Sequence, residues 1–328
     1  TMVTMVDFFG DVPYSEAIQE GNFNPVVDPG ADIYAAMLAL LDQAISNFNS
    51  SASSEPNVDL YYGGDYDKWV KAANTLKLKI YLQSRLVDSN AMARFDEIIA
   101  SGNYIQDSSD DFVYNWPATS AAQPDSRHPR YGINYTTGGA GEYMSNWMMN
   151  LMATTNDPRI RFYFYRQQPA VPGQEIPPNE ELLRCSLQTP PPHYTSGGFT
   201  FCNLPNGYWG RDHGNALGIP PDGLLRSTWG VYPVGGLFDD DRFAAVTATS
   251  GGGGAGITNI LTAFGVDFML AEAAMVDGDF AGARDAMLAA FDKQMDKVLS
   301  FSTLDPSADL SLAPTPGEIA SYRNSIST

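Results

Sequence analysis

The stretch from Phe264 to Leu299 constrains the fold of this chain more than any other. Apolar side chains recur at helical spacing in its first half, at Phe264, Phe268, Ala271 and Met275. They recur in the same way in its second half, at Phe280, Ala283, Met287, Phe291, Met295 and Val298. Between the halves, Asp277-Gly278-Asp279 offers a glycine to end one helix and an aspartate to begin the next. The stretch predicts two antiparallel helices with about the length of a tetratricopeptide unit.

The first of these helices is apolar nearly all round, because Val266, Met269 and Leu270 leave little polar face. We expect other helices to cover it on every side. Upstream, residues 66–101 repeat the pattern of a helix pair, and residues 32–48 add a third amphipathic helix. The sequence therefore predicts a mainly α fold. We expect a single domain over residues 1–328, with a tetratricopeptide-like helical-repeat scaffold at about 30–102 and 262–300.

A long insertion, about residues 103–260, separates the two parts of the scaffold. It is rich in proline, glycine and aromatic residues, and it holds one predicted helix, residues 141–154. We expect that helix to turn Tyr143, Trp147, Met148 and Leu151 inward. Disordered segments are poor in aromatic residues, so the composition favours ordered loops. Long ordered loops tend to carry function, which makes the insertion the expected ligand-binding part.

The charge of the chain excludes some partners. Its 38 acidic and 19 basic residues give a net charge of −19, whereas nucleic acids and anionic membrane surfaces attract basic patches. No apolar run is long enough to span a bilayer. The chain opens Thr1-Met2 without a signal peptide, and we interpret it as a fragment that lacks its N-terminal segment.

Signatures of catalysis are missing from the sequence. It contains no His-Glu-x-x-His motif, no phosphate-binding Gly-Lys-Ser/Thr and no Gly-x-Ser-x-Gly. The glycine run Gly251 to Gly256 fits a dinucleotide pattern but lacks the strand and helix that such a motif needs. The three histidines do not have metal-ligand spacing. We therefore expect no catalysis, no cofactor and no metal.

Two features leave alternatives open. Asp239-Asp240-Asp241 has the oxygen ligands that Ca²⁺ prefers, and a solvated acidic loop is the other interpretation. Cys185 and Cys202 lie in the same loop-rich region. They form either one bridge or two free thiols, because a lone pair of cysteines does not establish a disulfide framework.

Aromatic residues beside glycines mark the candidate ligand site. The sequence reads Tyr208-Trp209-Gly210-Arg211-Asp212-His213 and, further on, Trp229-Gly230-Val231-Tyr232. Flat rings stack on the apolar faces of sugars, and polar neighbours bond the hydroxyl groups at their rims. We expect an exposed platform of four rings with three polar groups at its edge: Tyr208, Trp209, Trp229 and Tyr232, with Arg211, Asp212 and His213. In the alternative interpretation, these rings fill the core of the insertion itself.

Four stretches, taken in order, resemble one family. They are Phe9 to Ala17, which reads FGDVPYSEA, the helix from Asp65 to Lys79, the turn Asp157-Pro158-Arg159, and Phe268 to Gly278 with its Ala271-Glu272-Ala273. The chain is similar to the SusD/RagB outer-membrane nutrient-binding lipoproteins, in particular to the branch called SusD-like family two. The resemblance covers residues 9 to about 290.

The resemblance implies a surface protein that binds nutrients without transforming them. It implies glycan ligands, a lipid anchor outside this sequence as the link to the outer membrane, and a SusC-like TonB-dependent transporter as partner. It implies no ligand residue, since ligands of this family are bound by variable loops. A peptide ligand is the alternative within the family. A helical-repeat adaptor and a secreted glycosidase are the alternatives outside it, and the long aromatic insertion argues against the adaptor.

Overall fold

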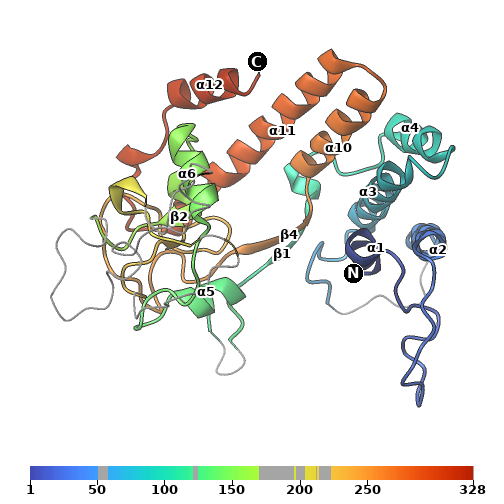
Figure 1. Cartoon of the computed structure of the whole chain (residues 1–328), viewed down its shortest axis with the longest axis horizontal. Helices are drawn as coiled ribbons and strands as arrows, with labels where there is room; N and C mark the ends of the chain where they lie inside the picture. Colours follow the sequence, from blue (N-terminus) through green and yellow to red (C-terminus); the bar gives the residue numbers. More distant parts are fainter. Residues whose placement is uncertain are drawn as a thin grey trace. The chain divides into compact units, whose positions relative to one another are not determined.

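The computed structural model describes residues 1–50, 58–120, 125–169, 196, 204–211, 213 and 223–327 (Figure 1). The chain forms two compact units, each built from two separate stretches. The first unit comprises Thr1–Val113 and Asn259–Lys293, and the second comprises Tyr114–Thr258 and Gln294–Thr328. Cys185 and Cys202 lie outside the described residues.

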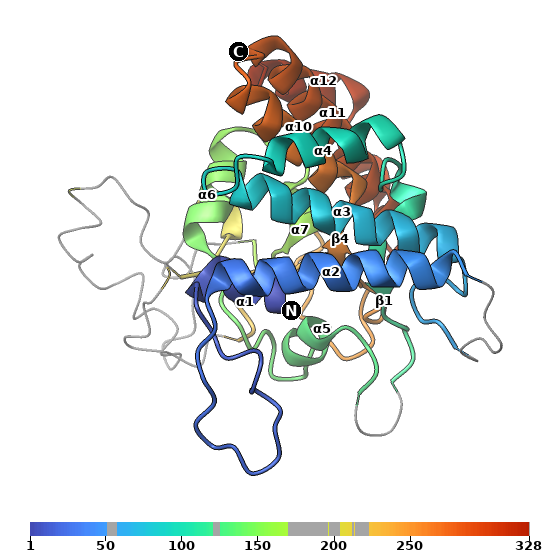
Figure 2. The ribbon, with the colours of Figure 1, turned by 90° about the vertical axis from the view of Figure 1, so that its right-hand side faces the viewer.

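Helices make up most of the first unit. They are α1 (Met2–Phe9), α2 (Gly30–Phe48), α3 (Tyr66–Ser84), α4 (Ala91–Ser101), α10 (Ala263–Val276) and the first part of α11 (Phe280–Ser300), with a short 3-10 turn, η1 (Ser108–Asp110). Figure 2 shows α3 between α2 and α4, and α3 also contacts α10. The mainly α fold is confirmed, and so are the two predicted helix pairs. The prediction of a single domain over residues 1–328 stays a prediction.

Local sequence explains where these helices begin and end. The side chain of Asp65 accepts a hydrogen bond from the backbone N–H of Lys68 and caps α3, and Thr262 caps α10 in the same way through Gly265. Gly102 ends α4 with φ of 67°, a left-handed conformation that glycine adopts without steric cost. These caps bring α3, α4 and α10 around one core, which contains Leu78, Leu82, Phe95, Ile105 and Val266.

The expectation that α10 is covered on every side is wrong within the described part of the chain. Val266 and Ala273 are buried in the core that α10 shares with α3 and α4. Phe268 is 44% exposed and Met275 is 59% exposed. The helix is apolar on all faces, so the sequence pattern does not identify the one face that packs.

Two strands connect the units along the chain. The chain leaves the first unit within β1 (Phe112–Asn115) and returns to it within β4 (Ile257–Leu261). These strands pair with each other as a two-stranded sheet. The indole of Trp116, just after β1, donates a hydrogen bond of 2.9 Å to the Thr258 hydroxyl. The two ends of the long segment between β1 and β4 therefore lie next to each other.

The second unit contains short elements joined by loops. They are α5 (Pro129–Asn134), α6 (Asn146–Thr154), α7 (Ile160–Tyr163), β2 (Phe164–Tyr165), η3 (Pro205–Gly207), β3 (Thr228–Trp229), η4 (Phe301–Leu304), η5 (Leu310–Leu312) and α12 (Pro316–Ser325), with the end of α11. Strands β2 and β3 pair antiparallel, with Phe164 opposite Trp229. Across the described residues, no helix combines the length and the apolar character that a membrane span requires.

Stacked tyrosines form the centre of this unit. The rings of Tyr131 and Tyr135 lie 4.3 Å apart and nearly parallel, and both are buried. The Tyr135 hydroxyl donates to the carbonyl of Trp229 and accepts from the N–H of Leu237. A Cβ at Gly236 would lie 2.0 Å from that hydroxyl, so the close approach requires glycine.

Helix α6 is shorter than predicted and faces another way. The hydroxyl of Ser145 accepts from the N–H of Met148, which fixes the start of the helix at Asn146 rather than near residue 141. The buried face is then Asn146, Met149 and Met152. The expected inward face is therefore wrong: Trp147 is 57% exposed, and Met148 and Leu151 are exposed as well.

We expect the substitution Trp69→Ala to lower the free energy of unfolding by about 3 kcal/mol, the lower end of the range for large aromatic residues, because Trp69 is only half-buried. Its ring stacks on Phe48 at 6.0 Å and meets Phe112 edge-on, and its indole N–H donates to Asp59. Denaturant unfolding measures the effect. Trp147→Ala is the matched control, expected to stay within about 0.5 kcal/mol. Equal effects at the two positions would contradict this prediction.

Candidate functional site

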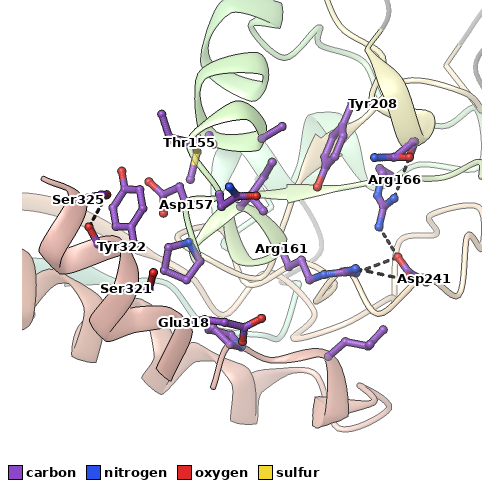
Figure 3. A pocket seen from close by; sticks show the side chains of 18 of the residues that line it. Thr155, Asp157, Arg161, Arg166, Tyr208, Asp241, Glu318, Ser321, Tyr322 and Ser325 are labelled. Atoms are coloured by element: carbon purple, nitrogen blue, oxygen red, sulfur yellow. Dashed lines mark hydrogen bonds and ion pairs between the residues drawn. The ribbon is translucent and has the colours of Figure 1, made fainter. Parts of the chain in front are cut away.

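A cavity of about 910 Å³ opens in the second unit. Its lining comes from the end of α6 and the turn after it, from α7 and the segment after β2, from residues 206–208, from residues 241–243 and from α12 (Figure 3). Arg166, Tyr208 and Asp241 lie on one side of it, and Ser321, Tyr322 and Ser325 lie on the other. This volume lies within the usual range for ligand sites, roughly 300–1,000 Å³.

The turn Asp157-Pro158-Arg159 forms one wall. The carboxylate of Asp157 accepts from the backbone N–H of Arg159 at 3.0 Å and from its guanidinium at 2.8 Å and 2.5 Å. Asn156 precedes it with φ of 55°, a left-handed conformation in which asparagine is enriched among non-glycine residues. Arg159 also donates to Gln294 on α11. The turn is thus fixed by bonds to its own backbone and to a neighbouring helix.

Helix α12 forms the facing wall. Its start is a capping box, in which Thr315 accepts from the N–H of Glu318 and the Glu318 carboxylate accepts from the N–H of Thr315. Bonds from the backbone and hydroxyl of Thr315 lower the pKa of Glu318. Four side chains at helical spacing line the cavity from this helix, namely Glu318, Ser321, Tyr322 and Ser325.

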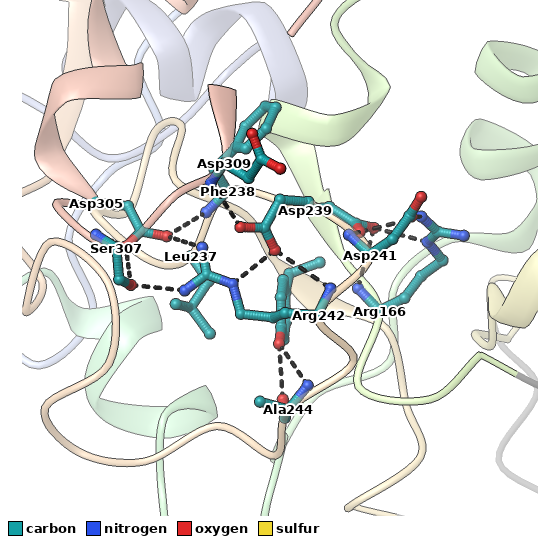
Figure 4. A network of polar contacts seen from close by, with 12 residues as sticks. Arg166, Leu237, Phe238, Asp239, Asp241, Arg242, Ala244, Asp305, Ser307 and Asp309 are labelled. Atoms are coloured by element: carbon teal, nitrogen blue, oxygen red, sulfur yellow. Dashed lines mark hydrogen bonds and ion pairs between the residues drawn. The ribbon is translucent and has the colours of Figure 1, made fainter. Parts of the chain in front are cut away.

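An ion-pair network forms the remaining wall (Figure 4). Arg166 donates to the two carboxylate oxygens of Asp239 at 2.7 Å and 3.0 Å, and both residues are buried. Arg166 also pairs with Asp241, to which Arg161 donates at 2.8 Å. Burial acts to lower the pKa of Arg166, but the bonds to Asp239 outweigh it and raise that pKa. The hydrogen bond from Arg161 is the main reason why the pKa of Asp241 is lowered.

Residues 239–242 also contact the segment that follows α11. Asp240 accepts from the guanidinium of Arg242 at 2.6 Å, and Arg242 also donates to Asp305 at 2.9 Å (Figure 4). Each carboxylate of Asp239-Asp240-Asp241 is therefore paired with arginine, neither free for calcium nor merely solvated. No group of three or more metal-binding side chains occurs within the described residues.

Aromatic rings complete the lining. The guanidinium of Arg166 lies 4.9 Å from the centre of the Tyr208 ring and 5.1 Å from that of Phe243. Burial raises the pKa of Tyr208, so its hydroxyl stays protonated at neutral pH. Tyr322 on α12 is half-buried. The guanidinium carbon of Arg159 lies 5.8 Å from the centre of its ring. The cavity thus combines ring faces with hydroxyl, amide and carboxylate groups.

The expected exposed platform is wrong for three of its four rings. Trp209 is 0% exposed, Tyr208 6% and Tyr232 3%. Trp229 is half-buried, and its indole donates to Glu142. Of the polar residues expected at the rim, Arg211 is buried over the Tyr143 ring, His213 is exposed, and Asp212 lies outside the described residues. Among the described residues of the predicted set, only Tyr208 lines the cavity.

Close backbone contacts explain this burial. Trp209 exchanges two hydrogen bonds of 2.9 Å with Ser227, and Arg211 exchanges backbone bonds with Met144 and Asn146. A Cβ at Gly210 would lie 2.1 Å from the carbonyl oxygen of Met144, and one at Gly230 would lie 2.2 Å from that of Phe162. The glycine beside each tryptophan therefore serves the close approach of two backbones, not an exposed loop.

Several lining residues were not expected from the sequence, among them Arg161, Arg166, Glu318 and Tyr322. Two signals in the sequence pointed to their surroundings. The Asp157-Pro158-Arg159 motif indicates a turn, but the sequence does not show that this turn forms a wall of a site. Thr315-Pro316-Gly317-Glu318 has the pattern of a capped helix start.

Taken together, the chain is a helical-repeat protein that carries a ligand-sized cavity in a second, loop-rich unit. A family model described as "Starch-binding associating with outer membrane", that of SusD-like proteins, matches residues 1–174, more than half of the 328 residues. The chain belongs to this SusD-like family, and the resemblance drawn from its sequence is confirmed. No curated protein matches the chain.

Solved structures share the fold. A SusD homolog from Bacteroides fragilis is 19% identical with a TM-score of 0.59, and covers 98% of this chain and 61% of its own. A chitin-binding SusD homolog from Flavobacterium johnsoniae is 20% identical with a TM-score of 0.58, and the match covers 92% of this chain and 52% of the homolog. A SusD/RagB family protein from Bacteroides thetaiotaomicron is 19% identical with a TM-score of 0.60, and the match covers 99% of this chain and 58% of that protein. The chain thus spans 52–61% of the length of these proteins.

Proposed function

We propose that this chain binds glycans without transforming them, and that the cavity between α12 and the Asp157-Pro158-Arg159 turn holds the saccharide. The observation that carries the proposal is the lining: Tyr208, Tyr322 and Phe243 supply rings, and side chains such as Asn156, Asn206 and Ser321 supply hydrogen-bonding groups around them. Sugars present apolar faces and hydroxyl rims, so they need both kinds of group at once. The family description and the chitin-binding homolog support the same class of ligand.

We also propose that the protein acts at the outer membrane, through a lipid anchor outside this sequence, and delivers its ligand to a SusC-like TonB-dependent transporter. This part rests on the family alone. Affinity purification of the full-length protein from detergent-solubilised outer membranes tests it. Recovery of the protein without any barrel partner would contradict this part and leave glycan binding intact.

Calorimetric titration of the purified chain with chitohexaose, maltohexaose and cellohexaose tests the site. We expect binding of at least one of them, and we expect Tyr322→Ala to weaken that binding about tenfold, or ~1.4 kcal/mol. The substitution removes a ring and a hydroxyl from the wall of the cavity. Asn324→Ala is the matched control, because Asn324 is exposed on the same helix and does not line the cavity.

Three other results of these experiments would each lead to a different conclusion. Unchanged affinity in Tyr322→Ala would place the site elsewhere on the chain. Binding of peptides in place of all three sugars would favour the peptide-binding alternative within the family. Sustained release of reducing ends by the pure protein, abolished by changing one acidic residue, would show that it is an enzyme.

A further inference from the structure

Both arginines that line the cavity are already paired with carboxylates. Arg161 donates to the Asp241 carboxylate through both terminal nitrogens, at 2.8 Å and 3.2 Å. Arg166 is paired with Asp239, which is buried, and with Asp241, which lines the cavity. Neither guanidinium is therefore free to receive an anionic group from a ligand without losing a partner that is fixed in place.

Within the part of the chain that the structure describes, one carboxylate in the lining is not balanced by a cation. Among the described residues, Glu318 accepts hydrogen bonds only from Thr315, the N-cap of its helix, and no lysine or arginine lies within ion-pair distance of it. Asp157, the remaining acid of the lining, is paired with Arg159. Among the described residues, the other charged side chains of the lining are thus paired with an opposite charge, and Glu318 is not. Figure 3 shows Glu318 on one side and Asp241 on another; in this view the side chain of Arg161 lies between them and points at Asp241.

We infer that this cavity selects uncharged glycans, and that Asp241 and Glu318 are the residues that exclude uronic-acid and sulfated sugars. The inference rests on the proposed function and names the class of glycan. A carboxylate is acceptor-only when ionised, so it takes hydrogen bonds from sugar hydroxyls. Glu318 has the same sign of charge as a uronate and repels it, whereas Asp241 occupies Arg161, the cation that would otherwise attract the uronate. One pair of residues therefore attracts a neutral sugar and rejects an acidic one.

The chain allows this charge to be removed without disturbing the backbone. Asp241 has φ of 62°, and asparagine is at least as well suited to that conformation as aspartate. After Asp241→Asn, the closest remaining carboxylate contact of Arg161 is to Asp239, at 3.7 Å, so Arg161 becomes available to an anion. Glutamine can replace glutamate in a capping box, so Glu318→Gln keeps the start of α12.

The test compares hexagalacturonate with chitohexaose, maltohexaose and cellohexaose by calorimetry. We expect the unmodified chain to bind its preferred neutral hexasaccharide at least about tenfold more tightly than hexagalacturonate. In the Asp241→Asn, Glu318→Gln double variant we expect that ratio to fall about tenfold or more, mainly because hexagalacturonate binds more tightly. Glu318→Gln alone, on an exposed side chain, is expected to give part of the change.

The control double variant is Glu97→Gln, Asp285→Asn. It removes the same charge from exposed positions on α4 and α11, and it is expected to leave the ratio unchanged. Equal affinity of the unmodified chain for the neutral and acidic sugars would overturn the inference and leave glycan binding standing. So would an unchanged ratio in the Asp241→Asn, Glu318→Gln chain. Failure to bind any of the four sugars would instead refute the proposed function.

Discussion

Replacing Trp209 with alanine is expected to lower the free energy of unfolding by about 3–5 kcal/mol, the usual cost of truncating a large buried aromatic residue. The indole is 0% exposed and packs against Tyr143 and Leu225. Its backbone is fixed on one side by the two hydrogen bonds to Ser227, so the neighbouring chain cannot easily close the space. Chemical denaturation followed by circular dichroism measures the change.

Trp209→Phe is the informative comparison. Among the described residues, the indole nitrogen of Trp209 has no hydrogen-bond partner, so phenylalanine loses ring area but no bond. We expect this variant to be clearly more stable than Trp209→Ala. Stability unchanged in the alanine variant, with a selective loss of sugar binding, would restore the original expectation of an exposed ligand platform.

Replacing Arg166 with methionine is expected to cost about 3–5 kcal/mol as well, because it leaves a buried carboxylate without its main partner. Asp239 is fully buried and accepts two bonds from the Arg166 guanidinium, whereas Arg161 approaches it only at 3.7 Å. Thermal and denaturant unfolding of the purified chain measure the loss.

Two further variants separate the buried pair from the exposed one. Arg161→Met removes a contact to Asp241, which is partly exposed, and is expected to cost no more than about 1 kcal/mol. The double change Arg166→Met, Asp239→Leu is expected to regain part of the stability, since an apolar pair can replace a buried ion pair. A loss in the double variant as large as in Arg166→Met would show that the cost does not come from the unpaired charge.

The helical scaffold could be predicted because its signals are local. Asp65, Thr262 and Gly102 act at the helix ends that their own sequence context indicates, through bonds to residues three positions away. Helix α6 shows where this reasoning fails. The periodicity of Tyr143, Trp147 and Leu151 is as helical as that of its buried face, but one hydroxyl, that of Ser145, decides where the helix begins. Periodicity also does not show which face packs, and here Met149 and Met152 pack in one cluster with residues that are distant in the chain, such as Leu204.

The cavity could not be predicted because its walls meet across long separations in the chain. Tyr208 meets Arg166, and Arg166 meets Asp239, 73 residues further along. A sequence shows that Asp239-Asp240-Asp241 is acidic but not which arginines face it. The glycines beside Trp209 and Trp229 were ambiguous for the same reason. Gly210 and Gly230 allow either an exposed turn or a close approach to a distant backbone, and here the distant backbone is present.

The return of the chain through β4 has a consequence for the order in which the protein folds. The core around α3 and α4 includes Ala263 and Val266, which follow the whole of the segment between β1 and β4. During synthesis, α3 and α4 leave the ribosome long before α10 exists, so that core stays incomplete until the segment has been made. Closing so long a loop costs entropy that only the later contacts repay. Helices α3 and α4 are therefore made well before α10, and their shared core is completed only after α10 has been made.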